Sequence, residues 1–225
     1  MYNKKAARYY EQGRALHQKG KLSDSERAYK KAIRISPEFV PAYNNLGNVL
    51  LDRGRLKLAT DTYRKALNLS PDHPMLLNNL GNALQLQGEN KKAVRWLNKA
   101  ISKNPDYADA YNNLGNALVG LRQLAEAVAS YDTAIELQPS SPEFYFNRGC
   151  ALNDLDKLEA AVGSYEHAIQ LRSDYAEAYY NCGIALKDLG RMKESIESWN
   201  KVIQLKPDST ETHRNLSTIK TYQIM

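Results

Sequence analysis

The sequence has little of what marks secreted, membrane-spanning or disulfide-stapled proteins. It contains only two cysteines, Cys150 and Cys182, and they do not form a Cys-x-x-Cys pair. We therefore expect buried, reduced thiols and neither a disulfide framework nor a cysteine zinc site. No apolar run approaches the roughly 18 residues of a membrane helix, and Met1 to Arg14 is polar and charged. We expect no membrane span, no secretory signal and a cytoplasmic location.

The sequence also lacks a Gly/Pro/Ser-rich linker, so we expect one continuous architecture. The net charge of +6 is unevenly distributed: the first 37 residues hold ten Lys/Arg against three Asp/Glu, and the other 188 hold 21 against 22. Because the basic charge gathers at one end, we interpret it as a solvated cap and do not expect nucleic acid as a partner. Steering of an acidic partner or of nucleic acid is the alternative role of this patch.

One phrase of the sequence recurs. AYNNLGN stands at residues 42 to 48 and again at 110 to 116, and LLNNLGN stands midway at 76 to 82, so the spacing is 34 residues. Prolines follow the same period at Pro37, Pro71, Pro105, Pro139 and Pro207. A unit that starts at residue 6 gives six repeats: 6–39, 40–73, 74–107, 108–141, 142–175 and 176–209. Such a period is typical of a solenoid.

The residues of each unit predict two antiparallel helices. Apolar residues follow helical spacing on both sides of the fifteenth place, where a turn glycine ends the first helix in four units: Gly20, Gly54, Gly88 and Gly190. The eighth place is always glycine: Gly13, Gly47, Gly81, Gly115, Gly149 and Gly183. The twentieth place is always Ala or Ser. Small residues at both places allow the two helices to cross closely.

This pattern resembles the tetratricopeptide repeat family in unit length, in its small residues, in the proline at the thirty-second place and in Tyr at the fourth place: Tyr43, Tyr111, Tyr145 and Tyr179. The resemblance covers residues 6 to 209 and implies an all-α solenoid, a right-handed superhelix of six repeats in a single domain. Residues 210–225 begin a seventh unit and are expected to form a capping helix. Arg122 and Asp156 replace the turn glycine, so an altered turn is expected there.

No combination of residues predicts catalysis. The four histidines occupy four different repeat places: His17, His73, His167 and His213. They therefore face different directions, which excludes a His-based dyad or metal site, and no histidine is placed to activate either cysteine. The glycines belong to turns and helix crossings and form no phosphate-binding loop. We expect no enzyme activity, no metal and no cofactor.

The asparagines are the candidate binding residues. In the resembling family the first helices line the concave side, and the fifth, sixth and ninth places point toward it. A side-chain amide both donates and accepts, so it can hold the C=O and N–H of an extended peptide. The candidates are Asn44, Asn45, Asn48, Asn78, Asn79, Asn82, Asn112, Asn113, Asn116, Asn147 and Asn181. The alternative is that these amides only bond to the neighbouring helix.

Three further expectations concern partners. Members of the family that grip a carboxylate tail use Lys and Arg at places where this sequence has Asn44, Met75 and Asn113, so we expect no chaperone-tail binding. Units two to four also resemble the repeat arm of O-linked N-acetylglucosamine transferases, and residues 213 to 217 are similar to the joining helix of bacterial repeat-fused transferases. A scaffold that binds an extended peptide is therefore the main hypothesis. The alternative is a substrate-recruiting arm of a larger glycosyltransferase or sulfotransferase, and self-association through the stack ends is a third option.

Overall fold

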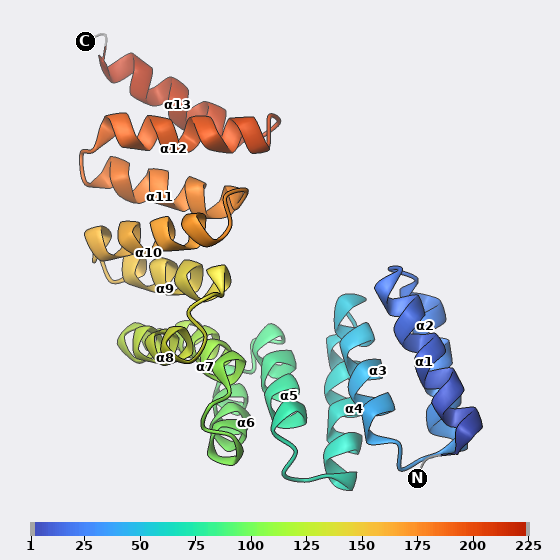
Figure 1. Cartoon of the computed structure of the whole chain (residues 1–225). Helices are drawn as coiled ribbons and strands as arrows, with labels where there is room; N and C mark the ends of the chain where they lie inside the picture. The colour runs from blue at the N-terminus through green and yellow to red at the C-terminus, as the bar shows by residue number, and fades with distance from the viewer. Residues whose placement is uncertain (1–2, 224–225) are drawn as a thin grey trace. The chain divides into compact units, whose positions relative to one another are not determined.

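The computed structural model describes residues 3 to 223, with side chains to residue 218, and this part contains thirteen α-helices and no strand (Figure 1). The helices are α1 Lys4–Gln18, α2 Leu22–Ile35, α3 Val40–Asp52, α4 Leu56–Leu69, α5 Pro74–Leu86, α6 Asn90–Lys103, α7 Ala108–Gly120, α8 Leu124–Leu137, α9 Pro142–Asp154, α10 Leu158–Leu171, α11 Ala176–Asp188, α12 Met192–Leu205 and α13 Thr210–Gln223. The last two residues of the predicted capping segment, 224 and 225, lie outside the described residues. Among the helices described, none has the length and apolar character needed to cross a bilayer.

The turns inside the helix pairs keep one geometry whether or not glycine is present. The four turn glycines have φ between 69° and 77°, in the left-handed region that glycine adopts most easily. Arg122 (φ 61°) and Asp156 (φ 59°) adopt the same conformation. First helices end 34 residues apart at Asp52, Leu86, Gly120, Asp154 and Asp188. The prediction of an altered turn at these two residues is therefore wrong, because the neighbouring helices hold non-glycine residues in the glycine conformation.

A ring or branched side chain covers the eighth-place glycine of five helix pairs. A Cβ added at Gly47 would lie 2.3 Å from Cε1 of Tyr63, which is far inside contact distance. The same arrangement joins Gly13 with Tyr29, Gly81 with Leu97, Gly149 with Tyr165 and Gly183 with Trp199. The large side chain thus fills space within a repeat, against the eighth-place glycine of the same repeat. Hydrogen bonds fix two of these crossings, from Ser25 Oγ to Gly13 O at 2.8 Å and from Ser195 Oγ to Gly183 O at 2.7 Å.

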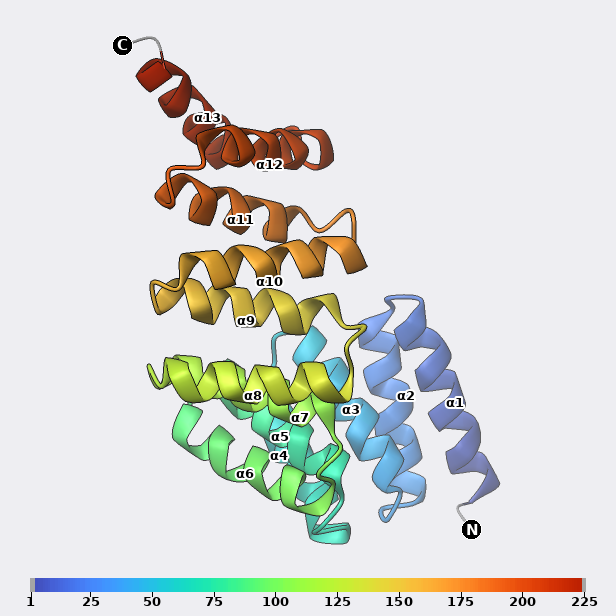
Figure 2. The same ribbon diagram turned by 60° about the vertical axis from the view of Figure 1, so that its left-hand side comes forward.

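The chain divides into two compact units, Met1–Leu121 and Arg122–Met225, which we call unit 1 and unit 2. Unit 1 contains α1 to α7 and unit 2 contains α8 to α13. In both views the helices of unit 2 from α8 to α12 lie one beside the next in chain order (Figures 1 and 2). The boundary falls at Arg122, where the turn glycine is absent.

Within each unit the first helices of successive helix pairs lie closer together than the second helices of those pairs. In unit 1, α1 contacts α3, α3 contacts α5 and α5 contacts α7. In unit 2, α9 contacts α11. The second helices of the same unit make no comparable contacts in the described part of the chain. Each unit therefore curves with its first helices on the inside. We call the solvent side of the first helices the inner face and that of the second helices the outer face.

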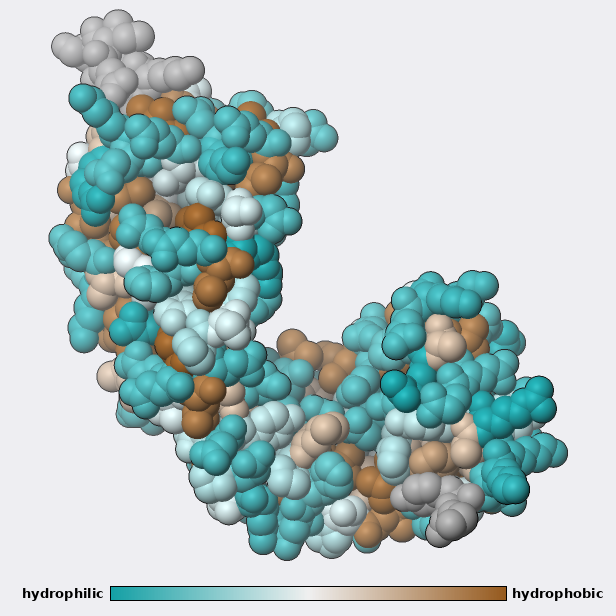
Figure 3. All heavy atoms as spheres, viewed as in Figure 1, coloured by the Kyte–Doolittle hydropathy of each residue, from teal (hydrophilic) through white to brown (hydrophobic). Residues whose placement is uncertain are grey.

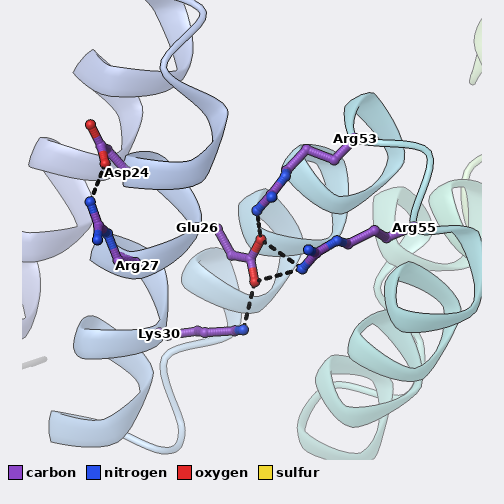
Figure 4. Close-up of polar contacts among 6 residues, drawn as sticks. All are labelled: Asp24, Glu26, Arg27, Lys30, Arg53 and Arg55. Carbon is purple, nitrogen blue, oxygen red and sulfur yellow. Dashed lines mark hydrogen bonds and ion pairs between the residues drawn. The ribbon is translucent and has the colours of Figure 1, made fainter.

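An ion cluster around the buried Glu26 joins the first two helix pairs of unit 1 (Figure 4). Glu26 on α2 is only 5% exposed. Its carboxylate accepts a hydrogen bond from Lys30 at 2.6 Å and pairs with Arg53 and Arg55 from the α3–α4 connection. Burial alone would raise the pKa of Glu26, but the Lys30 bond and the charges of Arg53 and Arg55 outweigh it and hold the pKa below its ordinary value.

Candidate functional site

Side-chain amides form a ladder along the inner face of unit 1. Each sixth-place asparagine donates to the fifth-place side chain of the preceding helix pair, so one bond recurs with every repeat. The three bonds run from Asn45 Nδ2 to Tyr10 Oη (3.2 Å), from Asn79 Nδ2 to Asn44 Oδ1 (2.9 Å) and from Asn113 Nδ2 to Asn78 Oδ1 (2.9 Å). The ladder therefore joins consecutive first helices and fixes the orientation of these amides.

The fifth-place asparagines lie inside the ladder. Asn44 is 9% exposed and Asn78 is 4% exposed. Asn44 Nδ2 donates to Asn45 Oδ1 at 3.3 Å, and Asn78 Nδ2 donates to Asn79 Oδ1 at 3.2 Å. These two bonds lie within one helix, while Oδ1 of Asn44 and Oδ1 of Asn78 accept from Asn79 and Asn113 on the next first helix, as the structural alternative for these positions predicts. Sequence analysis placed both residues toward the groove, but the close approach of successive first helices covers them.

The ninth-place asparagines differ in what binds them. Asn48 Oδ1 accepts from Tyr63 Oη at 2.6 Å and from Asn79 Nδ2 at 3.5 Å, which leaves the Asn48 amide nitrogen without a partner in the described residues. Asn82 has no hydrogen-bond partner among the described residues, because Leu97 stands where the preceding repeat has Tyr63. Asn82 is half-buried, so its donor and its acceptor are both available on the inner face.

Beside the ladder lies a hollow of about 820 Å³ in unit 1. Side chains from α1, α3, the end of α4 and the start of α5 line it, together with the α2–α3 and α4–α5 connections. Leu69 and Met75 are each 46% exposed there, and Arg14 and Glu38 are its charged members. The hollow adjoins Asn45. It therefore combines apolar surface with the polar end of the ladder.

The inner face of unit 1 is almost free of charge beyond α1. Helices α3, α5 and α7 together contain no Lys or Arg and only two Asp. Electrostatic attraction of a charged ligand is therefore weak along these helices.

The other candidate asparagines differ from Asn82 in having partners within the protein. Asn112, Asn116 and Asn147 are half-buried, and each has a partner. In unit 2, Asn181 Nδ2 reaches Cys150 Sγ at 3.5 Å, because Phe146 at the fifth place offers no acceptor. Phe146 instead packs against Tyr175, with ring centroids 5.0 Å apart.

Both thiols lie where burial disfavours the thiolate form. Cys182 is buried, and burial raises its pKa to about 12. Cys150 was predicted to be buried but is only half-buried, since it lies at a small inner-face hollow of unit 2 beside Asn181. Burial raises the pKa of Cys150 as well. Across the described residues, no group of three His, Cys, Asp or Glu side chains is arranged to hold a metal ion.

Comparison with solved structures found close matches in fold. YrrB, described as a TPR protein with an unusual peptide-binding site, is 26% identical, with a TM-score of 0.63 over 84% of this chain and 97% of that chain. PilF of Pseudomonas aeruginosa is 21% identical, with a TM-score of 0.79 over 95% of this chain and 97% of that one. A chain of the APC/C hetero-tetramer Cut9-Hcn1 is 18% identical, with a TM-score of 0.84 over 95% of this chain and 42% of that chain. Comparison with curated proteins gave no match.

Family models cover most of the chain. Models described as tetratricopeptide repeat or TPR repeat match residues 13–52, 39–103, 86–121, 108–141, 130–163, 149–190 and 176–209. One of them alone matches residues 13–52, 86–121 and 149–190, more than half of the chain. The helix order and the solved neighbours agree with an all-α solenoid that ends in a further helix, α13. The chain therefore belongs to the tetratricopeptide repeat family.

Proposed function

We propose that this protein is an interaction scaffold that binds an extended peptide segment on the inner face of unit 1, without catalytic activity of its own. The observation that carries the proposal is the unpartnered amide of Asn82 beside a ladder of ordered amides. The peptide-binding site named for YrrB, a related fold at 26% identity, supports the same class of function. The six repeats at 6–39 through 176–209, with the cap at 210–225, are the framework of this proposal.

The chemistry of backbone binding follows from the free groups. Asn82 donates through Nδ2 to a peptide C=O and accepts through Oδ1 from a peptide N–H. Asn48 donates through Nδ2 only, since Tyr63 occupies its oxygen. Asn44 and Asn78 act in support, because their bonds hold Asn79 and Asn113 in place before a ligand arrives. Groups that are already ordered lose little conformational entropy on binding.

The hollow supplies the apolar part of recognition. Leu69 and Met75 expose almost half of their surface, and covering apolar area contributes about 25 cal/mol per Å². A peptide that lies along the ladder reaches this hollow beside Asn45. We therefore propose that the bound segment carries one large apolar side chain for the hollow. Because α3, α5 and α7 hold no Lys or Arg, binding there is expected to change little with salt.

Leu97→Tyr tests this proposal by removing the free amide without removing the residue. The new hydroxyl is expected to reach Asn82 as Tyr63 Oη reaches Asn48 at 2.6 Å. A fluorescein-labelled peptide of about 12 residues, selected on the wild type from a random phage library, serves as the probe in fluorescence anisotropy. The Kd is expected to rise about threefold to tenfold, the equivalent of one net hydrogen bond.

Asn82→Ala is expected to give the same loss, and the double variant no further loss, because both changes act on one amide. Asn98→Ala is the matched control, since Asn98 is an exposed asparagine on α6, and it is expected to leave the Kd unchanged. Unchanged binding by Asn82→Ala, or additive losses in the double variant, would contradict the proposal.

A further inference from the structure

Positive charge in unit 1 is concentrated on its second helices. Helices α2, α4 and α6 carry twelve Lys and Arg against three Asp and Glu. The second helices of unit 2, α8, α10 and α12, carry two against seven. Since α3, α5 and α7 contain no Lys or Arg and α1 is the only first helix of unit 1 that carries them, the second helices make the outer face of unit 1 a basic surface. Hydrophilic side chains cover the end of unit 1 formed by α1 and α2 in Figure 3.

Half of these cations are not neutralised by the protein. Lys30 and Arg64, for example, pair with Glu26 and Asp61. Six exposed cations have no carboxylate within 4.0 Å in the part of the chain that the structure describes: Lys31, Arg34, Lys57, Lys65, Lys91 and Arg95. We call this group the outer basic face. Uncompensated cations on one surface raise the local concentration of an anionic partner.

An aromatic ring lies among these cations. Trp96 on α6 follows Arg95 directly, is half-buried, and has Lys99 Nζ 5.9 Å from its ring centroid. The same repeat place holds the small residues Ala28 on α2 and Thr62 on α4, so the fold does not demand a large ring there. An aromatic ring beside cations is the combination that stacks a nucleobase while neighbouring Lys and Arg hold phosphates.

We propose that the outer basic face of unit 1 binds single-stranded nucleic acid, with phosphates on the unpaired Lys and Arg and a base against Trp96. Lys31 and Lys65 occupy the same place on successive second helices, so cations recur along the stack at its own period. A flexible single strand follows such a convex row, whereas a rigid duplex touches it over a short length. This inference is independent of peptide binding, which uses the opposite face of the unit.

The fold revises the expectation that the basic charge is confined to one end. Residues 38 to 121 hold ten Lys/Arg against seven Asp/Glu, and the count over the remaining 188 residues concealed this by including the acidic unit 2. Helical periodicity then places the cations together, because the buried sides of α4 and α6 take only apolar and small residues.

Fluorescence anisotropy of the full chain with a fluorescein-labelled oligo-dT of about 20 nucleotides tests the proposal between about 50 and 200 mM KCl. Binding is expected to weaken steeply with salt. The variant Lys31→Glu/Lys65→Glu/Arg95→Glu, with one change on each second helix, is expected to weaken binding at least tenfold and to flatten the salt dependence. Lys157→Glu/Lys193→Glu/Lys201→Glu makes the same change in net charge within unit 2 and is expected to change the Kd by less than twofold.

Trp96 separates nucleic acid from other polyanions. Trp96→Leu, which keeps apolar packing, is expected to weaken oligo-dT binding about tenfold, while Trp96→Phe retains most of it. Neither variant is expected to alter binding of a polyglutamate peptide of similar charge, and Asn82→Ala is expected to leave oligo-dT binding intact. The proposal is overturned if oligo-dT does not bind at the lowest salt. It is equally overturned if polyglutamate or phosphatidylserine vesicles bind as tightly as oligo-dT and Trp96→Leu has no effect.

Discussion

Unit 1 carries twenty Lys and Arg against ten Asp and Glu, and unit 2 carries eleven against fifteen. Both units are nevertheless built from the same helix pair with the same glycine crossing, as Gly47 with Tyr63 and Gly149 with Tyr165 show. The difference lies in the solvent-facing places, which the packing leaves free. In a solenoid each repeat contacts only its neighbours, so two halves can diverge in surface chemistry without change to the fold.

The inner faces differ in the same way. Unit 1 repeats an amide-to-amide bond at Asn79 and Asn113. Unit 2 keeps the donor but changes the acceptor: Asn181 meets Cys150 Sγ at 3.5 Å and Asn215 meets Tyr180 Oη at 3.4 Å. The recurring element is thus the sixth-place donor, and the fifth and ninth places decide what it binds. A regular binding ladder belongs to unit 1.

The largest expected effect on stability tests whether the glycine crossing is equally tight in the two units. Gly47→Ala places a Cβ 2.3 Å from the Tyr63 ring, and Gly149→Ala places one 2.6 Å from the Tyr165 ring. Because both rings are buried and rigid, each variant is expected to lower the free energy of unfolding by about 3 kcal/mol. Urea unfolding followed by circular dichroism measures this.

Gly163→Ala is the matched control for these two variants, since nothing lies within 4 Å of a Cβ built there. It is expected to stabilise unit 2 by about 0.5 to 1 kcal/mol, because alanine replaces glycine within a helix. If Gly47→Ala lowers the free energy of unfolding and Gly149→Ala does not, the crossings of the two units are not equivalent.

A smaller effect is expected at Glu26, the buried carboxylate of unit 1. Unit 2 has Val162 where unit 1 has Glu26. The pKa of Glu26 is held below its ordinary value. Its ion cluster therefore stabilises the fold at pH values above the ordinary pKa of a glutamate. This contribution is lost as the pH falls through the lowered pKa. Glu26→Gln is therefore expected to cost about 2 kcal/mol at neutral pH and much less near pH 3.

Urea unfolding over that pH range measures the difference for Glu26→Gln. Glu166→Gln on α10 is the control, because Glu166 is exposed, and little change is expected. A cost that stays constant down to low pH would show that the carboxylate charge is not what stabilises unit 1.

The smallest effect concerns the turns. All three turns of unit 1 that join a first to a second helix have glycine, whereas unit 2 has Arg122 (φ 61°) and Asp156 (φ 59°) in the same conformation. Arg122→Gly is expected to stabilise the protein by about 1 kcal/mol or less, because a side chain with positive φ is strained. Asp156→Gly is expected to stabilise the protein by a smaller amount, since Asp tolerates a positive φ better than Arg.

Gly54→Ala makes the reverse exchange in unit 1 and is expected to destabilise by a similar amount, because nothing lies within 4 Å of the added Cβ and only φ, at 69°, opposes it. Thermal unfolding of the three variants gives the comparison. If Arg122→Gly lowers stability, the turn conformation is not strained.

Much of the fold follows from residues that recur. The glycine at the eighth place and the small residues at the twentieth predict the crossing, and the structure confirms it where Ser25 and Ser195 at the twentieth place donate to the carbonyl oxygens of Gly13 and Gly183. The binding site was less predictable. Sequence periodicity places Asn44, Asn45 and Asn48 on one helix surface, but it does not show that Asn44 is 9% exposed. Exposure depends on how closely the next first helix approaches.

The sequence by itself determined the repeat length, the helix pair, the all-α class and the family, because these depend on which residues tolerate a tight crossing or a left-handed turn. Only the tertiary structure decided which asparagines are free. Asn48 and Asn82 occupy the same place in consecutive repeats. Tyr63 bonds Asn48 at 2.6 Å, whereas Leu97 leaves Asn82 without a hydrogen-bond partner among the residues that the structure describes. Whether an amide can bind a ligand is set by the side chain that packs beside it, and that neighbour lies on another helix, 15 residues away in the sequence.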